Sequence, residues 1–339
     1  LTIANLVGAV LSFAQGILVA RWLGPQLYGV AALVMSYPGL VFTFFDTRSS
    51  EASVKYLSEF HTQGNREGAL AICKLGYIID FAIGFIAFLV ILLTANWSAR
   101  EIVHRPEVSG LIVIYAAVFI PRGLIGTSRA VLTSLGKFSW IAWIDALTTF
   151  LRVGLILGLV YAGWKVEGVV WGNAIAIIAT SLVYGVIGWV QIRKIWGAFP
   201  YRGKWQTIKE QRRGIFSFLA YNNFSTLLAM LPKQMDVLLL GYFRNPTEVG
   251  YYNLAKRLAT IVNYIVSPLQ SVTYPELSRL WGSGRKYALR KKARDLALKI
   301  GLPLGLVVLF FTLFLPIIIP AFLGEEYRSS ITADRKSVV

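Results

Sequence analysis

The chain has 339 residues, of which 56% are hydrophobic and only 15% are charged, and its mean hydropathy is +0.60. Soluble domains hold about 45–50% apolar and about 25% charged residues, so the composition excludes an ordinary soluble domain and predicts a protein whose solvent is partly lipid. The formal net charge is +17. In a soluble protein that charge would favour nucleic-acid binding, but here the basic residues lie between apolar runs, as in membrane loops, and we expect no nucleic-acid partner.

Nine apolar stretches are long enough to cross a membrane, because a spanning helix needs about 20 residues. They cover residues 2–20, 28–45, 75–95, 110–132, 139–162, 168–191, 215–241, 249–271 and 301–323. The first stretch has no basic segment before it, so it is expected to be a spanning helix and not a cleaved signal peptide. The sequence therefore predicts an all-α integral membrane protein with about nine transmembrane helices.

Basic residues outside these stretches are concentrated in the loops after the second, fourth, sixth and eighth spans. The segments 191–214 and 272–299 are the richest in them. By the positive-inside rule these loops and the N-terminus are cytoplasmic. We therefore expect a multi-pass protein of the inner (plasma) membrane, with residues 276–299 attracted to the anionic lipid surface.

A weak duplication relates two parts of the chain. Pro25-Gln-Leu-Tyr-Gly29 follows the first span, and Pro246-Thr-Glu-Val-Gly250 follows the seventh, at an offset of 221 residues. Six spans separate the two copies, so both have the same orientation, which is the pattern of a parallel repeat in transporters. The repeat predicts that residues 1–95 superpose on residues 218–323.

The repeat and the loops together predict the organisation of the chain. We expect a six-helix N-terminal lobe at 1–192, a cytoplasmic linker at 193–214, a truncated three-helix C-terminal lobe at 215–323 and a polar tail at 324–339. The two lobes are related by the parallel repeat, and the substrate site of such proteins lies between them.

Five segments resemble one known family. They are Leu18–Gly29, Asp236–Gly241, Gly250–Leu258, Tyr274–Ser278 and Gly324–Tyr327. In order and spacing they are similar to the Wzx-like oligosaccharide flippases of the multidrug/oligosaccharidyl-lipid/polysaccharide (MOP) exporter superfamily, over residues 1–327. The family continues into further helices after the last segment, whereas this chain ends in a polar tail.

The resemblance implies two lobes that enclose a central cavity. It also implies translocation of an undecaprenyl-diphosphate-linked oligosaccharide by alternating access, for O-antigen, capsule or exopolysaccharide biosynthesis. The partners implied are the lipid-linked oligosaccharide, membrane lipids and other polysaccharide-assembly proteins. No cofactor is expected, and coupling to a proton or sodium gradient is left open.

Two other functions compete with a flippase. A cation or drug antiporter of the MATE type would favour an acidic cavity, whereas the charges inside the spans are mostly basic. A membrane glycosyltransferase would need a catalytic site, and the sequence has neither an Asp-x-Asp motif nor a large outer loop, so we expect no enzyme. Two histidines and one cysteine, far apart in the sequence, do not make a metal site.

Polar residues inside spans are candidates for the cavity, because a charge at mid-helix costs about 2.5–3.5 kcal/mol to insert. The candidate substrate-binding residues are Arg122, Arg152, Lys233, Asp145, Asp236, Asp80, Lys256, Arg257, Asn5, Gln15, Asn222 and Asn223. Three acids can neutralise three of the five bases, so a positive surplus remains, and it suits a pyrophosphate held by Arg122 and Arg152.

Structural roles are the alternative for the same residues. Asp145 is seven residues before Arg152 and shares a helix face with it, so the acid is expected to hold that guanidinium. Asp236 can hold Lys233, three residues away, or a cation of the next helix. The asparagines can line the cavity or form hydrogen bonds between helices.

Overall fold

A computed structural model of the chain describes residues 2–209, 211–303, 305–306 and 327. Inside that part, the side chains left undescribed are those of residues 2–6, 212, 231–234, 260–272, 274–275 and 300. The described residues form helices joined by short turns, with no β-strand among them. The α-helices are α1 (Thr2–Phe45), α2 (Ser49–Thr62), α3 (Arg66–Glu101), α4 (Ser109–Ala117), α5 (Phe119–Ser134), α6 (Phe138–Leu159), α7 (Lys165–Trp196), α8 (Arg212–Phe243), α9 (Pro246–Gly282) and α10 (Lys286–Leu296).

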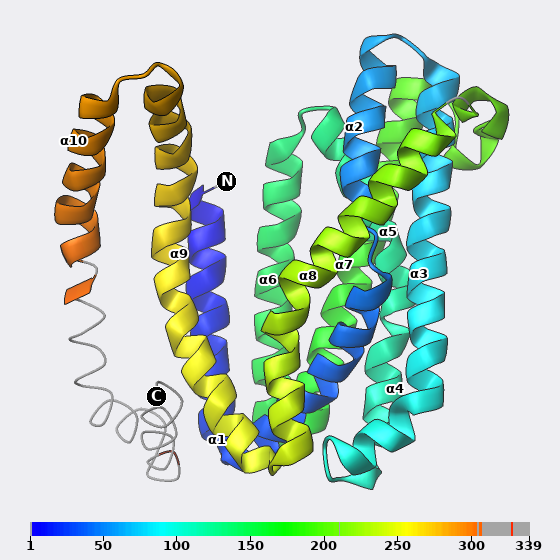
Figure 1. Cartoon of the computed structure of the whole chain (residues 1–339). Helices are drawn as coiled ribbons and strands as arrows, with labels where there is room; N and C mark the ends of the chain where they lie inside the picture. Colours follow the sequence, from blue (N-terminus) through cyan, green and yellow to red (C-terminus); the bar gives the residue numbers. More distant parts are fainter. Residues whose placement is uncertain (1, 210, 304, 307–326, 328–339) are drawn as a thin grey trace.

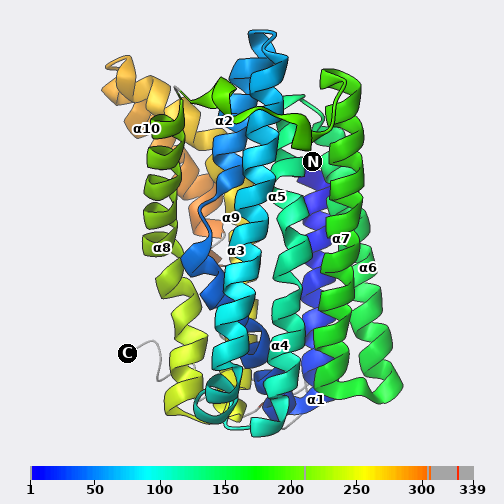
Figure 2. The ribbon, with the colours of Figure 1, turned by 90° about the vertical axis from the view of Figure 1, so that its right-hand side faces the viewer.

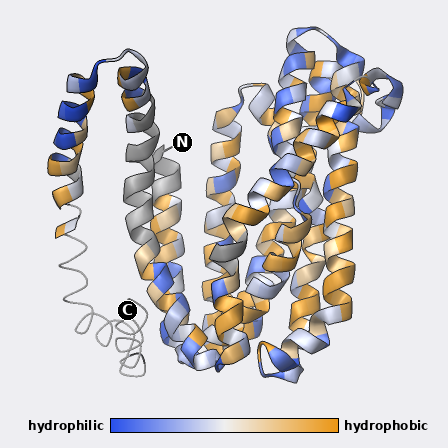
Figure 3. Ribbon diagram, viewed as in Figure 1, coloured by the Kyte–Doolittle hydropathy of each residue, from blue (hydrophilic) through white to orange (hydrophobic). Residues whose placement is uncertain are grey.

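Apolar residues make up much of the long helices (Figure 3), and many large apolar side chains are exposed on the outside of the bundle. Leu93 on α3 and Trp143 and Leu147 on α6 are 83%, 77% and 67% exposed. Among the described residues, four helical stretches are long and apolar enough to cross a membrane: Val7–Phe45, Arg66–Glu101, Pro106–Ser134 and Phe138–Trp196. The number is five if Arg213–Met230 and Met235–Phe243, which are bent by 51° relative to each other, form one span. Soluble proteins rarely expose apolar surface of this extent, so the expected all-α membrane protein is confirmed.

Two of the long apolar stretches reverse direction at a glycine. Gly24 has φ 71° and separates the two arms of α1, and Gly163 has φ 91° between α6 and α7. Glycine reaches this left-handed backbone region without steric cost. In Figure 1 the chain descends along the first arm of α1 and rises along the second. Eight of the nine predicted spans thus fall within described helices, whereas 301–323 lies almost wholly outside them, and the count of nine stays a prediction.

The sequence predicts a loop after the second span, and this prediction is wrong in detail because the segment contains α2. Asn65 caps the following helix by accepting a hydrogen bond from the Gly68 N–H at 2.9 Å, so α3 begins at Arg66 and not near residue 75. The side chains of Leu57 and Phe60 on α2 are 0% and 3% exposed. An amphipathic helix can bury one face against its neighbours, which explains why this polar segment packs on the bundle.

The other two long basic segments are also largely helical. The predicted linker holds the end of α7, two short helical turns (Pro200–Arg202 and Trp205–Ile208) and the start of α8. The segment 272–299 holds the end of α9 and the hydrophilic helix α10, which folds back along α9 (Figures 1 and 3). Lys292 Nζ lies 3.0 Å from Glu276 Oε1 and joins the two helices.

The described residues form three buried apolar clusters, one at each end of the bundle and a smaller one between α5, α6 and α7. At the end that carries α2, called the α2 end, the cluster joins α2, α3, α5, α7 and the start of α8. At the opposite end, called the Gly24 end, it joins α1, α3, α4, α7, α8 and α9. Figure 2 shows α3, α5, α7 and α6 side by side, with α8 beyond α3. The α8 helix thus runs from one cluster to the other.

Helices α1 and α9 make the most extensive helix–helix contact in the structure. At the Gly24 end the two repeated segments meet each other reciprocally. A Cβ atom built on Gly29 would lie 1.7 Å from the Pro246 carbonyl oxygen, and one built on Gly250 would lie 2.0 Å from the Pro25 carbonyl oxygen. Each glycine therefore lets the backbone of the other segment pack directly against its own. The contact has the form that a pseudo-two-fold axis between the copies would produce, while the superposition of the whole repeats stays a prediction.

Candidate functional site

A cavity of about 150 Å³ lies where both arms of α1 meet α6, α7 and α9. Its lining residues are Gln15, Val19, Tyr28, Ala31, Ala32, Met35, Arg152, Ile156, Val169, Asn173, Asn253 and Arg257. Two arginines and three amides face it, and no described lining residue is acidic. Because guanidinium groups are always charged and present a planar set of donors, the lining fits a phosphate-like anion.

Arg152 enters the cavity from α6. Its Nη2 donates a hydrogen bond to Ser12 Oγ on the first arm of α1 at 2.8 Å. A charge within a membrane helix is tolerated where it faces a polar cavity or a partner. Arg152 meets both conditions, because it lines the cavity and forms a hydrogen bond with a neighbouring helix.

Arg257 enters the cavity from α9, which lies in the C-terminal part of the chain. Its Nη2 donates to the carbonyl oxygen of Ser12 at 2.8 Å, and its Nη1 donates to the hydroxyl of Tyr28 at 3.2 Å. A Cβ built on Gly16 would lie 1.8 Å from the Arg257 Cζ, so the guanidinium occupies space that only a glycine leaves open. Ser12 thus brings the two arginines of the cavity together, one through its hydroxyl and one through its carbonyl.

The expected pairing of Asp145 with Arg152 is wrong. Asp145 Oδ2 is 2.8 Å from Arg129 Nη2 on α5, and the Tyr184 hydroxyl on α7 donates to Asp145 Oδ1 at 2.7 Å. Seven residues separate the two positions by two helical turns, about 10 Å along the axis. The adjacent helices offer closer partners, so Asp145 stabilises the packing of α5, α6 and α7 and is not among the cavity-lining residues.

Arg122 is also not among the residues that line the cavity. Its guanidinium lies over the rings of Phe42 and Phe119, at 5.0 Å and 6.0 Å from their centres. Arg122 therefore makes a cation–π contact with these two rings in place of a contact with the cavity.

Asp236 holds a cation of the next helix, one of the two partners left open by the sequence. Lys256 Nζ on α9 lies 2.7 Å from Asp236 Oδ2, and the Tyr252 hydroxyl donates to the same oxygen at 2.7 Å. The side chain of Lys233 lies outside the described part of the structure. Asp236 and Lys256 thus join α8 to α9.

Asp80 lies within the N-terminal bundle. Its carboxylate accepts hydrogen bonds from the Ser49 hydroxyl and from the backbone N–H and hydroxyl of Thr127, the latter at 3.0 Å and 2.8 Å. These donors come from α2 and α5, whereas Asp80 is on α3. Asp80 therefore links α2, α3 and α5 through its hydrogen bonds, and it is not among the residues that line the cavity.

The asparagines of α8 form hydrogen bonds between helices. Asn222 Nδ2 donates to Glu51 Oε2 at 3.2 Å, and Asn223 Nδ2 donates to the Asp46 carbonyl oxygen at 3.0 Å. They attach α8 to the first turn of α2 and to the turn between α1 and α2. Gln15 does line the cavity, while the side chain of Asn5 lies outside the described residues.

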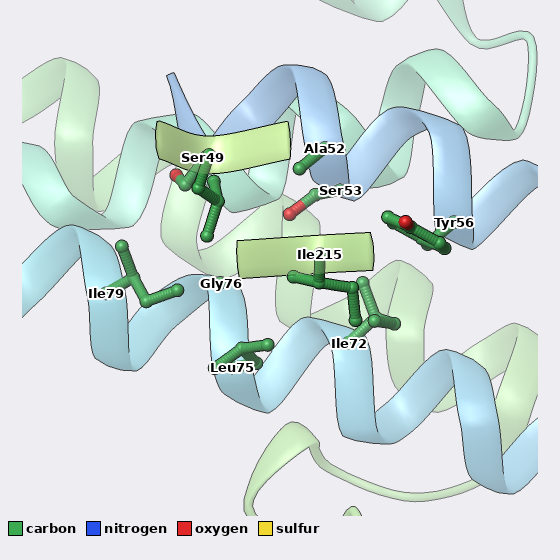
Figure 4. A pocket seen from close by; sticks show the side chains of 10 residues that line it. Ser49, Ala52, Ser53, Tyr56, Ile72, Leu75, Gly76, Ile79 and Ile215 are labelled. Atoms are coloured by element: carbon green, nitrogen blue, oxygen red, sulfur yellow. The ribbon is translucent and has the colours of Figure 1, made fainter. Parts of the chain in front are cut away.

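A second, much smaller pocket lies between α2, α3 and the start of α8 (Figure 4). Its volume is about 10 Å³, which is enough for roughly one water molecule. Ser49 and Ser53 supply hydroxyls, and the side chains of Ile72, Ile79 and Ile215 supply much of the apolar wall. Its size excludes a lipid diphosphate, so the first cavity is the candidate site.

Sequence reasoning missed four residues of this site. Tyr28 and Asn253 lie inside two of the five segments that carry the family resemblance, and that position was a usable signal. Asn173 and Gly16 lie in apolar stretches without any motif around them. Their roles depend on which helices meet, and a single sequence does not specify that.

The fold is similar to that of two solved membrane transporters. Two solved structures each match 98% of the chain at 17% identity. One is described as the inward-facing conformation of a multidrug resistance MATE family transporter of the MOP superfamily, with a TM-score of 0.67 and 79% of that chain covered. The other is a MOP superfamily transporter from Pyrococcus furiosus described by the reverse polarity of its binding pocket, with a TM-score of 0.64 and 75% covered. The chain therefore shares the fold of these two transporters.

Residues 1–281 match the family described as polysaccharide biosynthesis protein, and the chain belongs to this family. The "Probable flippase AglR" of Haloferax volcanii is 23% identical over 84% of this chain and 52% of its own length. The "Probable low-salt glycan biosynthesis flippase Agl15" of the same organism is 24% identical over 84% and 55%. The "Inner membrane protein YghQ" of Escherichia coli is 23% identical over 90% and 86%.

The resemblance to polysaccharide-export flippases is thereby confirmed, and it agrees with the expectation of a transporter and not an enzyme. The chain spans about half the length of the two Haloferax flippases that it matches.

Proposed function

We propose that the full-length protein is a flippase that moves an undecaprenyl-diphosphate-linked oligosaccharide across the inner membrane by alternating access, for cell-surface polysaccharide biosynthesis. The observation that carries the proposal is the pair of guanidinium groups, from Arg152 and Arg257, on one cavity whose described lining residues include no acid. A diphosphate offers several anionic oxygens, and arginines bind such groups with paired, charge-assisted hydrogen bonds.

The proposed division into lobes puts this cavity between them. Helices α1 to α7 correspond to the N-terminal lobe at 1–192, and α8 and α9 belong to the partial lobe at 215–323. Arg152 comes from the first lobe and Arg257 from the second, so a bound diphosphate would contact both. The basic lining argues against the alternative of a MATE-type antiporter for a cationic drug, because such a cargo would be repelled.

Reconstituted transport tests this function. The full-length gene product in proteoliposomes should move a fluorescent lipid-linked oligosaccharide to the opposite leaflet, where an impermeant quencher reaches it. Vesicles with an imposed proton or sodium gradient would show whether either ion drives the step. Equal rates with and without the protein, under every gradient, would contradict the proposal, as would transport of cationic dyes in place of the glycan.

The proposed orientation puts the N-terminus and the α2 end in the cytoplasm. We expect cysteines at Lys204 and Lys286, both exposed, to resist an impermeant thiol reagent added to intact cells or spheroplasts. A cysteine at Lys165, exposed after the turn between α6 and α7, should react rapidly and serves as the opposite-side control. The chain's one cysteine, Cys73, is 0% exposed and gives little background. Rapid labelling at Lys204 with protection at Lys165 would reverse the orientation.

A further inference from the structure

The guanidinium of Arg257 joins two helices that belong to different lobes, which must move relative to each other in the proposed function. It reaches from α9 to the first arm of α1, where the Ser12 carbonyl accepts at 2.8 Å, and to the second arm, where the Tyr28 hydroxyl accepts at 3.2 Å. Both acceptors belong to the proposed N-terminal lobe, whereas Arg257 belongs to the other. One side chain therefore ties α9 to both arms of α1.

The acceptors of this tether are neutral. A carbonyl and a phenol hydroxyl compensate part of the cost of a buried guanidinium, but they form weaker hydrogen bonds than an anionic oxygen would. Arg152 stands beside the same Ser12, and both arginines line the cavity. A diphosphate that enters the cavity between them therefore meets donors that are already occupied by weaker acceptors.

Gly16 is what allows the tether to form. A Cβ on this residue would lie 1.8 Å from Cζ and 1.9 Å from Nη1 of Arg257, so the side chain fits into a slot in the surface of α1. The atoms that a methyl group would meet are the far end of a flexible side chain and not backbone. An alanine at this position would therefore displace the guanidinium while the two helices keep their own structure.

We propose that Arg257 is an exchangeable tether between the lobes, seated in the Gly16 slot until an anionic diphosphate takes its donors and loosens the contact between α1 and α9 at the cavity. Gly16 is the positioning residue that sets the cost of the exchange. The inference rests on the proposed function, and it adds how binding of the ligand starts the movement of the lobes. A ligand shifts a conformational equilibrium only through different contacts in its two states, and the exchange of Arg257 supplies that difference.

Inorganic pyrophosphate is the probe for this exchange. The full-length gene product would carry a fluorophore and a quencher on cysteines at Val10 of α1, which is 61% exposed, and at the exposed Ala259 of α9. In the unchanged protein we expect pyrophosphate binding to alter the α1–α9 distance. In Arg257→Gln we expect affinity at least tenfold lower, and the distance should already be altered without ligand.

Gly16→Ala separates a tether from a simple structural contact. The displaced guanidinium no longer has to leave Ser12 and Tyr28, so we expect pyrophosphate to bind about two- to tenfold more tightly, with the distance altered before ligand is added. The matched control is Gly39→Ala on the same helix, where a Cβ meets no atom within 4 Å, and both readings should stay unchanged.

The outcomes distinguish the two proposals. If the unchanged protein binds no pyrophosphate, the proposed anion site fails and this inference with it. If pyrophosphate binds but the α1–α9 distance stays constant, the tether alone is overturned. Weaker binding in Gly16→Ala than in Gly39→Ala would also overturn it, because the slot would then be part of a fixed site.

Discussion

Replacement of Arg152 or Arg257 by alanine is expected to abolish transport of the lipid-linked glycan. Each guanidinium lines the cavity, and hydrogen bonds to charged groups contribute about 1.5–3 kcal/mol, so each loss should weaken diphosphate binding about 10- to 100-fold. Lysine at either position should retain part of the activity, because it keeps the charge and loses the planar pair of donors. The measurement is the translocation rate in proteoliposomes that contain equal amounts of inserted protein.

Arg122→Ala is the matched control for this prediction. Arg122 is an arginine of the same bundle, but its guanidinium lies over Phe42 and Phe119 and it is not among the cavity-lining residues. We expect a smaller decrease than for the two cavity arginines. A larger loss in Arg122→Ala than in Arg152→Ala would restore the pair that the sequence favoured and contradict the site described above.

A methyl group at Gly29 or Gly250 is expected to destabilise the contact between α1 and α9. At Gly29 it would meet the backbone of Pro246 at 1.7 Å, and at Gly250 the backbone of Pro25 at 2.0 Å. Because a backbone carbonyl cannot rotate away as a side chain can, the helices must move apart. Overpacking of this kind costs about 1–3 kcal/mol. Thermal unfolding of the purified full-length variants should show the loss for both alanine variants.

The double variant provides the sharper test. Either alanine alone should separate the two segments, so the second should add little, and the two costs should sum to more than the cost of the double variant. Gly39→Ala on α1 is the control, since a Cβ there meets no atom within 4 Å. Fully additive costs would mean that the two glycines do not share one contact, which would contradict the reciprocal arrangement of the repeats.

The sequence predicted the membrane class and the helices well, for a physical reason that acts locally. Each span must satisfy its own backbone hydrogen bonds and match the thickness of the bilayer, so a run of apolar residues is sufficient evidence. Boundaries were less accurate. The short amphipathic helix α2 and the hydrophilic α10 lie in segments that hydropathy marks as loops, because neither needs to cross the membrane.

Some of the predicted side-chain pairs are present in the structure and others are not. Asp236 and Lys256 do pair, as one of the two readings of the sequence allowed. Asp145 forms an ion pair with Arg129 and accepts a hydrogen bond from Tyr184, in place of the predicted pair with Arg152. Side chains on adjacent helices approach each other more closely than side chains two turns apart on one helix. A pattern along one helix gives the face that a residue occupies and does not give the partner across from it.

The sequence by itself determined that the chain is a helical membrane protein with basic loops, a duplicated Pro-x-x-x-Gly segment and a resemblance to polysaccharide-export flippases. Only the tertiary structure decided that the two copies of that segment touch each other and that Arg257, not Arg122, joins Arg152 at the cavity. The length of an apolar stretch and its charge are properties of a single segment, so they can be read directly from the sequence. A cavity is formed by helices more than two hundred residues apart, so it depends on how their surfaces pack.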